Sequence, residues 1–440
     1  MAQEPAANQP PTHSFPAASR TPDGFDVLIL DAGTRQSLAS ARSLGRAGLR
    51  VALAECFAEC DPALPVLAFR SRYCAGSVVL PSFATDAPGF AAAIIDFVRA
   101  HPTRVIMPAS DGAIAALMPW RGRLAALGCQ LALAPNAVLE VANSKARTLE
   151  VARGLGIEGP RSVWVDQPAQ LPAALAEVGL PCVLKPTIGW PDGAPARLQA
   201  TEVISETEAH QKARGFLAAG APVLVQELLS GRREGVTLLI QDNDVRASFA
   251  HTEHRTSPPL GGASVLRESI PMPDDIFDAA VRLVKALGLQ GLCGVEFRRN
   301  ASDQPLLMEI NARLAGQLET ALVSGVDFPL MTWQWATGQW VDQPAGYQTG
   351  VRMRWLRGDM RWLRDNHRRA GRPDSLSRGR ALRAFGAEFA RLPRYDCWDR
   401  RDLRPVLAEI RTTAAAIRNS KRKPPPPETE SLRKGAARAS

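Results

Sequence analysis

Residues 294–313 carry four polar side chains on two apolar runs joined by a short turn: Glu296, Glu309, Asn311 and Arg313. The turn is rich in loop-forming residues, so the two runs are expected to pair as a hairpin. Side chains alternate between the faces of a strand, which places the last three of these residues on one face. Glu296 on the partner strand can share it. Two carboxylates, an amide and a guanidinium are therefore expected on one patch.

Such a patch suits a magnesium ion held against phosphate oxygens. Mg²⁺ takes hard oxygen ligands and leaves coordination positions for a substrate. The competing interpretation is an ordinary half-exposed hairpin with charged outer positions. The spacing favours the metal site, because this set of groups would make a poor surface for a core.

The same segment resembles a known family. Its phrases Gly-Val-Glu-Phe and Met-Glu-Ile-Asn-Ala-Arg-Leu-Ala-Gly resemble the metal-binding end of the ATP-grasp superfamily, carboxylate–amine ligase type. The resemblance implies ATP and Mg²⁺ or Mn²⁺ as cofactors. It also implies that Glu296, Glu309 and Asn311 bind the metal, and that Arg313 is the catalytic residue that binds an acyl phosphate.

Two lysines occupy positions where the family binds ATP phosphates. Lys145 lies in the first turn of a helix that Asn143 or Ser144 can cap, although a cation is unfavourable at that end of the helix dipole. Lys185 ends an apolar strand before a proline, which keeps it extended. The resemblance assigns Lys145 and Lys185 to ATP. A solvated surface lysine is the alternative for Lys145, and the family's Asp-Lys pair is Ser144-Lys145 here.

Residues 221–240 are expected to form a strand, a polar crossing and a second strand. The resemblance implies that the backbone from Gln226 to Leu229 lies beside adenine and that an acidic side chain binds the ribose. Glu227 and Glu234 are the two acidic candidates, because Arg232-Arg233 lengthens the crossing. A charged hairpin tip is the alternative for both.

The phosphate-covering loop of the family is altered in this chain. The family has a Gly- and Ser-rich loop after the strand lysine, whereas residues 187–193 include Trp190 and Pro191. Proline has no N–H to donate to a phosphate. We therefore assign no phosphate contacts to this loop.

A second polar cluster follows at residues 251–264, which are expected to end a strand and open a loop. His254 and Arg255 in this segment are candidates to receive a substrate carboxylate, and Gly261-Gly262 supplies flexibility. A solvated loop is the alternative. Two histidines three residues apart, at positions 251 and 254, make a weak case for a metal without a third ligand.

The N-terminal part is expected to hold these groups on a doubly wound α/β scaffold, because strands and helices alternate up to about residue 137. The turn after the first strand has Gly33 alone, whereas a dinucleotide fingerprint needs three glycines. The predicted strands cover residues 25–30, 50–54, 105–108 and 130–135, and a helix capped by Ser37 runs to about Ala47.

The overall prediction is an α/β chain. It comprises a disordered leader (1–24), a Rossmann-like pre-ATP-grasp domain (25–140), an α+β ATP-grasp domain (141–345), a basic helical extension (346–418) and a disordered tail (419–440).

Charge is unevenly distributed along the chain. Residues 351–440 contain 24 Lys or Arg against 10 Asp or Glu, so they carry most of the basic charge and leave residues 1–350 net acidic. Nucleic acid is therefore not an expected partner. Trp355-Leu356 and Trp362-Leu363 recur seven residues apart, as on one helix face bordered by Arg. Core packing is one interpretation of this stripe, and contact with an anionic membrane or an acidic partner is the other.

The seven cysteines are scattered, which fits reduced thiols and a cytoplasmic protein. Cys56 and Cys60 form the only close pair and lack a second pair for zinc. No apolar run is long enough to cross a bilayer.

The implied reaction joins a small-molecule carboxylate to an amine through an acyl phosphate, with release of ADP and phosphate. One alternative is activation of bicarbonate, as in carboxylases and carbamoyl-phosphate enzymes. The other is a degenerate ATP-binding scaffold acting through its basic extension. The substrates remain open, and so does a homodimer.

Overall fold

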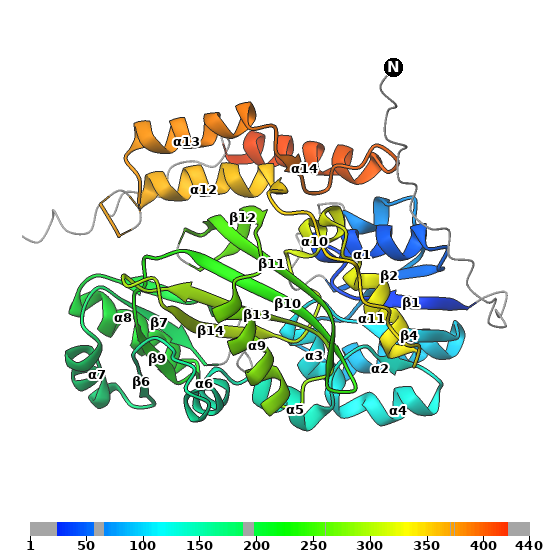
Figure 1. Ribbon diagram of the computed structural model, residues 1–440, viewed down its shortest axis with the longest axis horizontal. Helices are drawn as coiled ribbons and strands as arrows, with labels where there is room; N and C mark the ends of the chain where they lie inside the picture. The colour runs from blue at the N-terminus through cyan, green and yellow to red at the C-terminus, as the bar shows by residue number, and fades with distance from the viewer. Residues whose placement is uncertain are drawn as a thin grey trace, which may run out of the picture.

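The N-terminal part of the computed structural model is a parallel sheet with the strand order β3-β2-β1-β4-β5. The structure describes residues 24–56, 66–187, 198–259, 261–369, 371–373 and 375–420. Helices lie on both faces of this sheet, at the blue and cyan end of Figure 1. The strands are β1 (Phe25–Ile29), β2 (Val51–Cys56), β3 (Cys74–Leu80), β4 (Thr103–Met107) and β5 (Gln130–Leu131). The helices are α1 (Arg35–Arg46), α2 (Ala87–Ala100), α3 (Asp111–Leu117), α4 (Arg121–Ala126) and α5 (Asn136–Ala142).

The doubly wound prediction is confirmed for this part, with two local corrections. Helix α1 is capped by Thr34, whose side chain accepts a hydrogen bond from the backbone N–H of Ser37. Ser37 lies inside the helix instead, and its hydroxyl donates to the carbonyl of Leu30 at 2.8 Å. Strand β5 is only two residues long, because the chain turns away after Leu131.

A small antiparallel sheet forms the next unit, with the order β6-β9-β7-β8. It packs two helices over an apolar core of its own. Its elements are β6 (Ser162–Val165), α7 (Leu171–Val178), β7 (Cys182–Pro186), β8 (Thr201–Val203), α8 (Glu206–Ala218) and β9 (Val223–Glu227). Helix α6 (Lys145–Gly154) precedes it with Ser144 as the cap, so Lys145 lies in the first turn as predicted.

A seven-stranded sheet joins the two ends of the molecule, in the order β14-β13-β10-β11-β12-β15-β16. Its strands are β10 (Arg233–Gln241), β11 (Asp244–Ser257), β12 (Ala263–Ser269), β13 (Gly291–Arg299), β14 (Pro305–Asn311), β15 (Arg352–Arg354) and β16 (Arg394–Tyr395). Helices α9 (Asp274–Ala286), α10 (Leu318–Ser324) and α11 (Phe328–Ala336) pack around it. This arrangement confirms the predicted α+β architecture.

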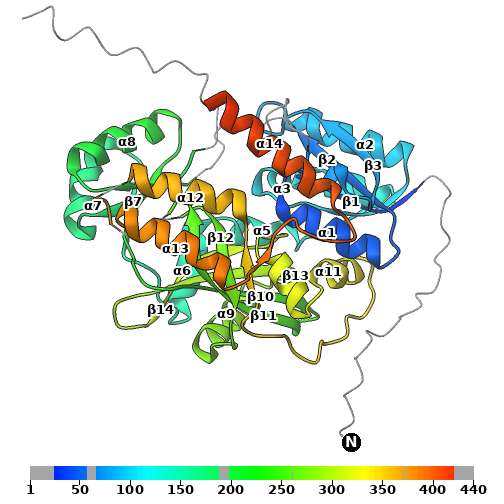
Figure 2. The same cartoon turned by 90° about the horizontal axis from the view of Figure 1, so that it is seen from above.

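The C-terminal extension consists of three helices that lie over the rest of the chain, as Figure 2 shows from above. They are α12 (Leu356–Arg368), α13 (Arg378–Ala390) and α14 (Arg404–Ser420). Helix α12 packs on β11 and β12, and α14 packs near residues 68–70 of the N-terminal part. Trp362 on α12 is buried, so one of the two predicted tryptophan positions packs into the core.

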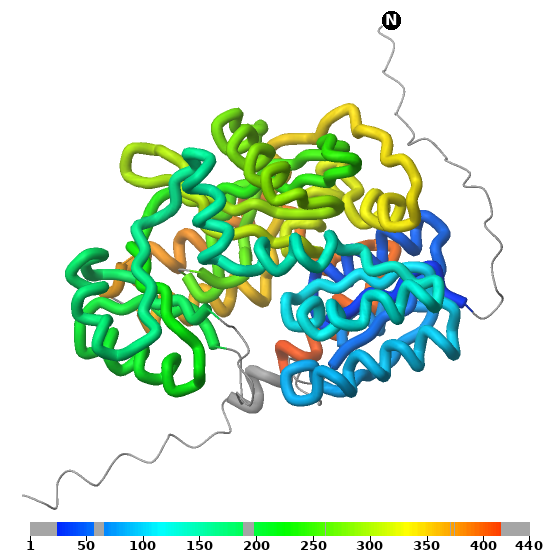
Figure 3. Tube along the Cα trace, turned by 90° about the horizontal axis from the view of Figure 1, so that it is seen from below, coloured from blue at the N-terminus to red at the C-terminus, as the bar shows by residue number. Residues whose placement is uncertain are grey.

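The Cα trace in Figure 3 shows the blue and cyan N-terminal sheet and the green four-stranded unit at opposite ends of the molecule. The predicted leader lies outside the described residues apart from Gly24, and so does residue 421 onward of the tail. In the described part of the chain, no helix is long and apolar enough to cross a bilayer.

Candidate active site

The β13–β14 hairpin brings the first four predicted residues together at one end of the large sheet. Glu296 lies directly opposite Glu309 in the register. The side chain of Asn311 donates from Nδ2 to Glu296 Oε1 at 2.9 Å and accepts at Oδ1 from Arg313 at 2.8 Å. The alternation of side chains along the strand therefore places Glu309 and Asn311 on one face with Glu296, as predicted.

Arg313 lies two residues beyond β14 and turns toward the N-terminal sheet. Its Nε donates to Asp111 Oδ1 at 2.6 Å, and Asp111 is the first residue of α3. This contact joins two parts of the chain that are 202 residues apart. Sequence reasoning missed Asp111 as a site residue. Its position could have indicated this role, because Asp111 lies just past the carboxyl end of a parallel strand, where α/β sheets bind ligands.

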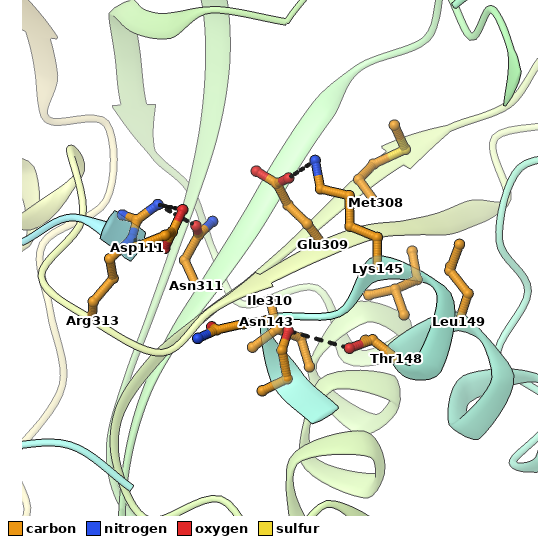
Figure 4. A pocket seen from close by; sticks show the side chains of 12 residues that line it. Asp111, Asn143, Lys145, Thr148, Leu149, Met308, Glu309, Ile310, Asn311 and Arg313 are labelled. Atoms are coloured by element: carbon orange, nitrogen blue, oxygen red, sulfur yellow. Dashed lines mark hydrogen bonds and ion pairs between the residues drawn. The ribbon is translucent and has the colours of Figure 1, made fainter. Parts of the chain in front are cut away.

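Figure 4 shows these groups around a cavity of about 110 Å³. Lys145 Nζ lies 3.0 Å from Glu309 Oε2, and both side chains are about one-third exposed. A smaller hollow lies on the other side of Lys145 and is lined by Lys185 at the end of β7. The two predicted phosphate-binding lysines therefore flank one region, between the hairpin and the small sheet.

The electrostatics of this region are unbalanced. Burial and the nearby Lys145 lower the pKa of Lys185 to about 7. Burial and the facing carboxylate of Glu309 raise the pKa of Glu296, whereas Lys145 lowers the pKa of Glu309. The site thus holds two lysines near each other and two carboxylates facing each other. Like charges kept this close are typical of functional sites.

The oxygen donors fit a hard divalent cation. Glu296 and Glu309 supply facing carboxylates, and the Asn311 amide lies against the first of them. Within the described residues, no group of three or more His, Cys, Asp or Glu could hold a metal, so this site depends on the amide as its third donor. Two carboxylates with open positions are the arrangement through which Mg²⁺ is usually bound alongside phosphates.

Three predicted nucleotide contacts lie at the end of β9. Gln226 is buried and donates to Ser162 Oγ at 2.9 Å. Glu227 accepts from the backbone N–H and the Nε of Arg161 at 2.9 and 3.0 Å. Leu229 is buried in the crossing that follows. Strand β9 pairs with β7, which carries Lys185, and the roles of these three residues toward adenine and ribose remain predictions.

Glu234 does not lie with them. It pairs in register with Phe297, whereas its neighbour Gly235 pairs with Glu296. Glu234 therefore points to the opposite face of the sheet, where it accepts from Arg299 Nε at 2.6 Å. Adjacent strand residues face opposite sides, so the ribose role predicted for Glu234 is wrong.

The substrate role predicted for the 251–264 segment is also corrected, because β11 continues to Ser257 and the loop is short. Arg255 is 8% exposed and donates twice to Asp359, at 2.7 and 2.8 Å. His254 lies 2.9 Å from Glu268. Arg255 is thus held in a buried ion pair and His254 contacts Glu268, so the substrate role predicted for these two residues is not supported.

Other polar residues do share the face of Glu296. Arg233 lies opposite both Glu253 and Arg298 in the register. Its NH1 lies 3.6 Å from Glu253 Oε2. These three residues share the face from which Glu234 is excluded, but the sequence alone could not give the register between strands so far apart in the chain.

Two predictions fall partly on residues that the structure does not describe. The altered loop lies outside the described residues from position 188 onward, and so does Cys60. Cys56 is buried at the end of β2.

Comparisons with known proteins agree with this geometry. The profile of a family described as ATP-grasp in the biosynthetic pathway with Ter operon matches residues 221–358. The N5-carboxyaminoimidazole ribonucleotide synthase of Mycobacterium tuberculosis is 27% identical over 225 residues, which are 47% of this chain and 51% of the relative. The chain thus spans about half the length of this curated relative.

Solved structures share the fold at low identity. An L-amino acid ligase from Bacillus licheniformis aligns with a TM-score of 0.55 and 18% identity, over 72% of this chain and 75% of its own. The biotin carboxylase domain of 2-oxoglutarate carboxylase from Hydrogenobacter thermophilus aligns with a TM-score of 0.57 and 13% identity, over 75% and 73%. Residues 221–358 thus match an ATP-grasp family, and most of the chain shares the fold of these solved structures.

Proposed function

We propose that the protein is an ATP-dependent carboxylate–amine ligase. A substrate carboxylate oxygen attacks the γ-phosphorus of ATP, the bond to ADP breaks, and an acyl phosphate forms. An amine then attacks the acyl carbon, loses a proton, and expels phosphate to leave an amide. Relatives with this fold are named for ligation of amino acids and for synthesis of N5-carboxyaminoimidazole ribonucleotide.

The observation that carries this proposal is the meeting of cations from three separate elements at one anionic hairpin. Lys145 comes from α6, Lys185 from β7 and Arg313 from the end of β14. These groups are positioned to neutralise phosphate oxygens, and phosphoryl transfer depends mainly on positioning and charge neutralisation.

Glu296, Glu309 and Asn311 would hold Mg²⁺ or Mn²⁺, which neutralises charge on the nucleotide phosphates when bound. Holding two facing carboxylates ionised without a cation is unfavourable, as the raised pKa of Glu296 indicates. Binding of the cation therefore favours the ionised form of the site. The solved relative from Hydrogenobacter thermophilus is described with MgADP and bicarbonate.

The acid and the amine are proposed to enter between the hairpin and the N-terminal sheet. Asp111 and Arg313 face each other there, across the cavity margin. We further propose a cytoplasmic location. A homodimer is also proposed, since the Hydrogenobacter thermophilus relative is described as one.

The test is ADP release from a library of small carboxylates and amines, with mass spectrometry of the product. An amide that forms only with ATP supports the ligase. Turnover that depends on bicarbonate would support the carboxylase alternative, and nucleotide binding without turnover would support a scaffold.

Glu309→Ala is the matched variant for this test. It should remove the magnesium-dependent part of nucleotide binding in calorimetry and abolish ADP release, while the unfolding temperature stays close to the wild type. The pair with Lys145 is about one-third exposed and contributes little to stability, so loss of activity will not reflect misfolding. Glu150→Ala on the same helix as Lys145 is the control and should keep full turnover.

A further inference from the structure

The outer side of α13, α14 and the segment between them exposes a concentration of large apolar side chains. Leu392 is 84% exposed, Leu382 is 59% exposed and Ile410 is 57% exposed. Groups of large exposed apolar side chains mark interaction sites. The set, here called the outer face, comprises Leu382, Phe389, Leu392, Trp398, Leu403, Leu407 and Ile410.

Helix α14 shows that this exposure follows one helix face. Val406, Ala408 and Thr412 are buried against the protein. The exposed positions recur at helical spacing on the opposite side, where a globular protein would normally place polar residues. They are Arg404, Leu407, Ile410, Arg411 and Ala414.

Every carboxylate between residues 378 and 414 is held by a partner in the underlying protein. Asp396 is buried on Arg267, and Asp402 is buried on Arg42 at 2.9 Å. The other three carboxylates also have partners on other elements: Glu388 pairs with Arg352, Asp399 with Arg46, and Glu409 accepts from Trp355.

The arginines of the same segment are all exposed. They are Arg378, Arg380, Arg383, Arg391, Arg394, Arg400, Arg401, Arg404 and Arg411. Acidic groups are thus directed inward and basic groups outward, so the outer face combines apolar side chains with positive charge. This segregation cannot be read from the net charge of the segment.

Both helices lie on the same outer side of the molecule, along the top of Figure 1 and toward the viewer in Figure 2. A symmetric contact between two copies through this face would set arginines against arginines, which is unfavourable. An anionic surface has the complementary charge, and apolar side chains of amphipathic helices enter the boundary between headgroups and acyl chains.

We propose that the outer face docks on an anionic lipid surface. The guanidinium groups pair with lipid phosphates, which they can bind through two parallel hydrogen bonds. The leucines, Phe389 and Trp398 enter the interface, where aromatic rings with a polar edge are favoured. The proposal does not depend on the ligase activity, because it uses none of the residues of the hairpin site.

The test is flotation of the full chain with two kinds of vesicle. One contains phosphatidylcholine alone, and the other contains about one third phosphatidylglycerol. We expect binding to the anionic vesicles and little to the neutral ones. We also expect the bound fraction to fall steeply as salt rises, because screening weakens attraction to the surface.

Two double variants separate the two contributions. Arg404→Glu with Arg411→Glu should weaken binding to anionic vesicles at least about 10-fold, since each basic residue near the surface contributes on the order of 1 kcal/mol. Leu407→Gln with Ile410→Gln removes the apolar contacts without changing the charge and should weaken binding to a similar extent. The control combines Arg214→Glu with Val79→Asp, at exposed positions on other elements, and should bind as the wild type does.

The substituted residues are exposed, so these variants should fold normally. An unchanged unfolding temperature would verify that they do. A chain that ends at Ser420 should keep binding, which separates the outer face from the basic residues beyond it. Failure of the full chain to float with anionic vesicles at low salt overturns the proposal. Unchanged vesicle binding by both double variants also overturns it. Loss of self-association by these variants in sedimentation would do the same, because it would make the outer face an interface between copies of the chain.

Discussion

Two groups of charged residues at the large sheet and its neighbouring elements differ in how their charges are balanced. Beneath the C-terminal helices, Arg255 and Arg354 share Asp359, and all three side chains are almost fully buried. At the hairpin site, Glu296 faces Glu309, and Lys145 lies near Lys185. The first group is satisfied by its own partners, whereas the second holds like charges together beside a cavity.

The difference indicates how structural and functional ions can be separated in one fold. A buried ion pair is retained when both partners and their hydrogen bonds are present, and removing one partner is costly. A half-exposed cluster with repelling neighbours instead stores electrostatic free energy that a ligand of opposite charge can release. Variants of the two groups should therefore fail in different assays.

The largest expected effect is on stability. Asp359→Ala leaves Arg255 without one buried carboxylate and Arg354 without its close partner, and should lower the free energy of unfolding by about 3–5 kcal/mol. Urea denaturation measures it. The control is Arg364→Ala on the same helix, whose exposed pair with Asp365 should cost less than about 0.5 kcal/mol. Equal losses in the two variants would refute the distinction.

Arg313→Lys should affect turnover and leave stability nearly unchanged. Lysine keeps the charge but cannot contact Asp111 and Asn311 as a fork. We expect ADP release to fall about 10²–10³-fold, the usual cost of one positioned donor. Arg282→Lys, at an exposed position on α9, is the matched control and should be fully active. Activity within a few-fold of the wild type would remove Arg313 from the reaction.

A smaller effect should appear as pH dependence at His251, which lies on the strand that connects the two groups. Burial lowers the pKa of His251 to about 3, whereas its ordinary value is 6.5. Below pH 6.5, His251 therefore binds a proton in the unfolded chain but stays neutral in the folded chain. The free energy of unfolding consequently falls as the pH drops from 6.5 toward 3.

Between pH 7 and pH 5.5, His251 should account for a loss of about 1 kcal/mol of unfolding free energy, and His251→Asn should lack this part. Denaturant titrations at the two pH values measure it. His210→Asn, at an exposed position on α8, should keep the wild-type difference. A parallel shift of both variants would show that the loss comes from other groups.

The smallest effect is expected at Arg372, which joins the segment after α12 to the small sheet. It donates to Glu208 on α8 at 2.7 Å, and both side chains are about one-quarter exposed. Arg372→Gln should cost less than about 1 kcal/mol. If the Arg372–Glu208 pair restrains α8, hydrogen exchange of the amides along α8 should be faster in the variant. Unchanged exchange there would show that the pair does not restrain the helix.

Local patterns predicted the hairpin and the lysine positions well. Glu309 and Asn311 are two residues apart on one strand, so alternation alone settles their shared face. Ser144 caps the helix of Lys145, as its side chain and position indicate. These features depend on neighbours within a few residues, which a single sequence contains.

The errors came from partners that are distant in the sequence. Arg255 was assigned to substrate because its carboxylate partner Asp359 lies 104 residues away. Glu234 was one of two candidates for the ribose because the sequence does not show the register of β10 on β13, which decides the face of this side chain. In α1, two nearby hydroxyls competed for one capping role, and Thr34 rather than Ser37 holds it.

The bond between Arg42 and Asp402 has a consequence for synthesis on the ribosome. Arg42 is fully buried in α1, and its carboxylate partner follows 360 residues later. At about 5–20 residues per second, translation takes on the order of 20–70 s to reach that partner. Until then, the guanidinium of Arg42 in the nascent N-terminal part lacks the carboxylate of Asp402 that allows its burial. The final packing of α1 therefore waits until residue 402 has been synthesised.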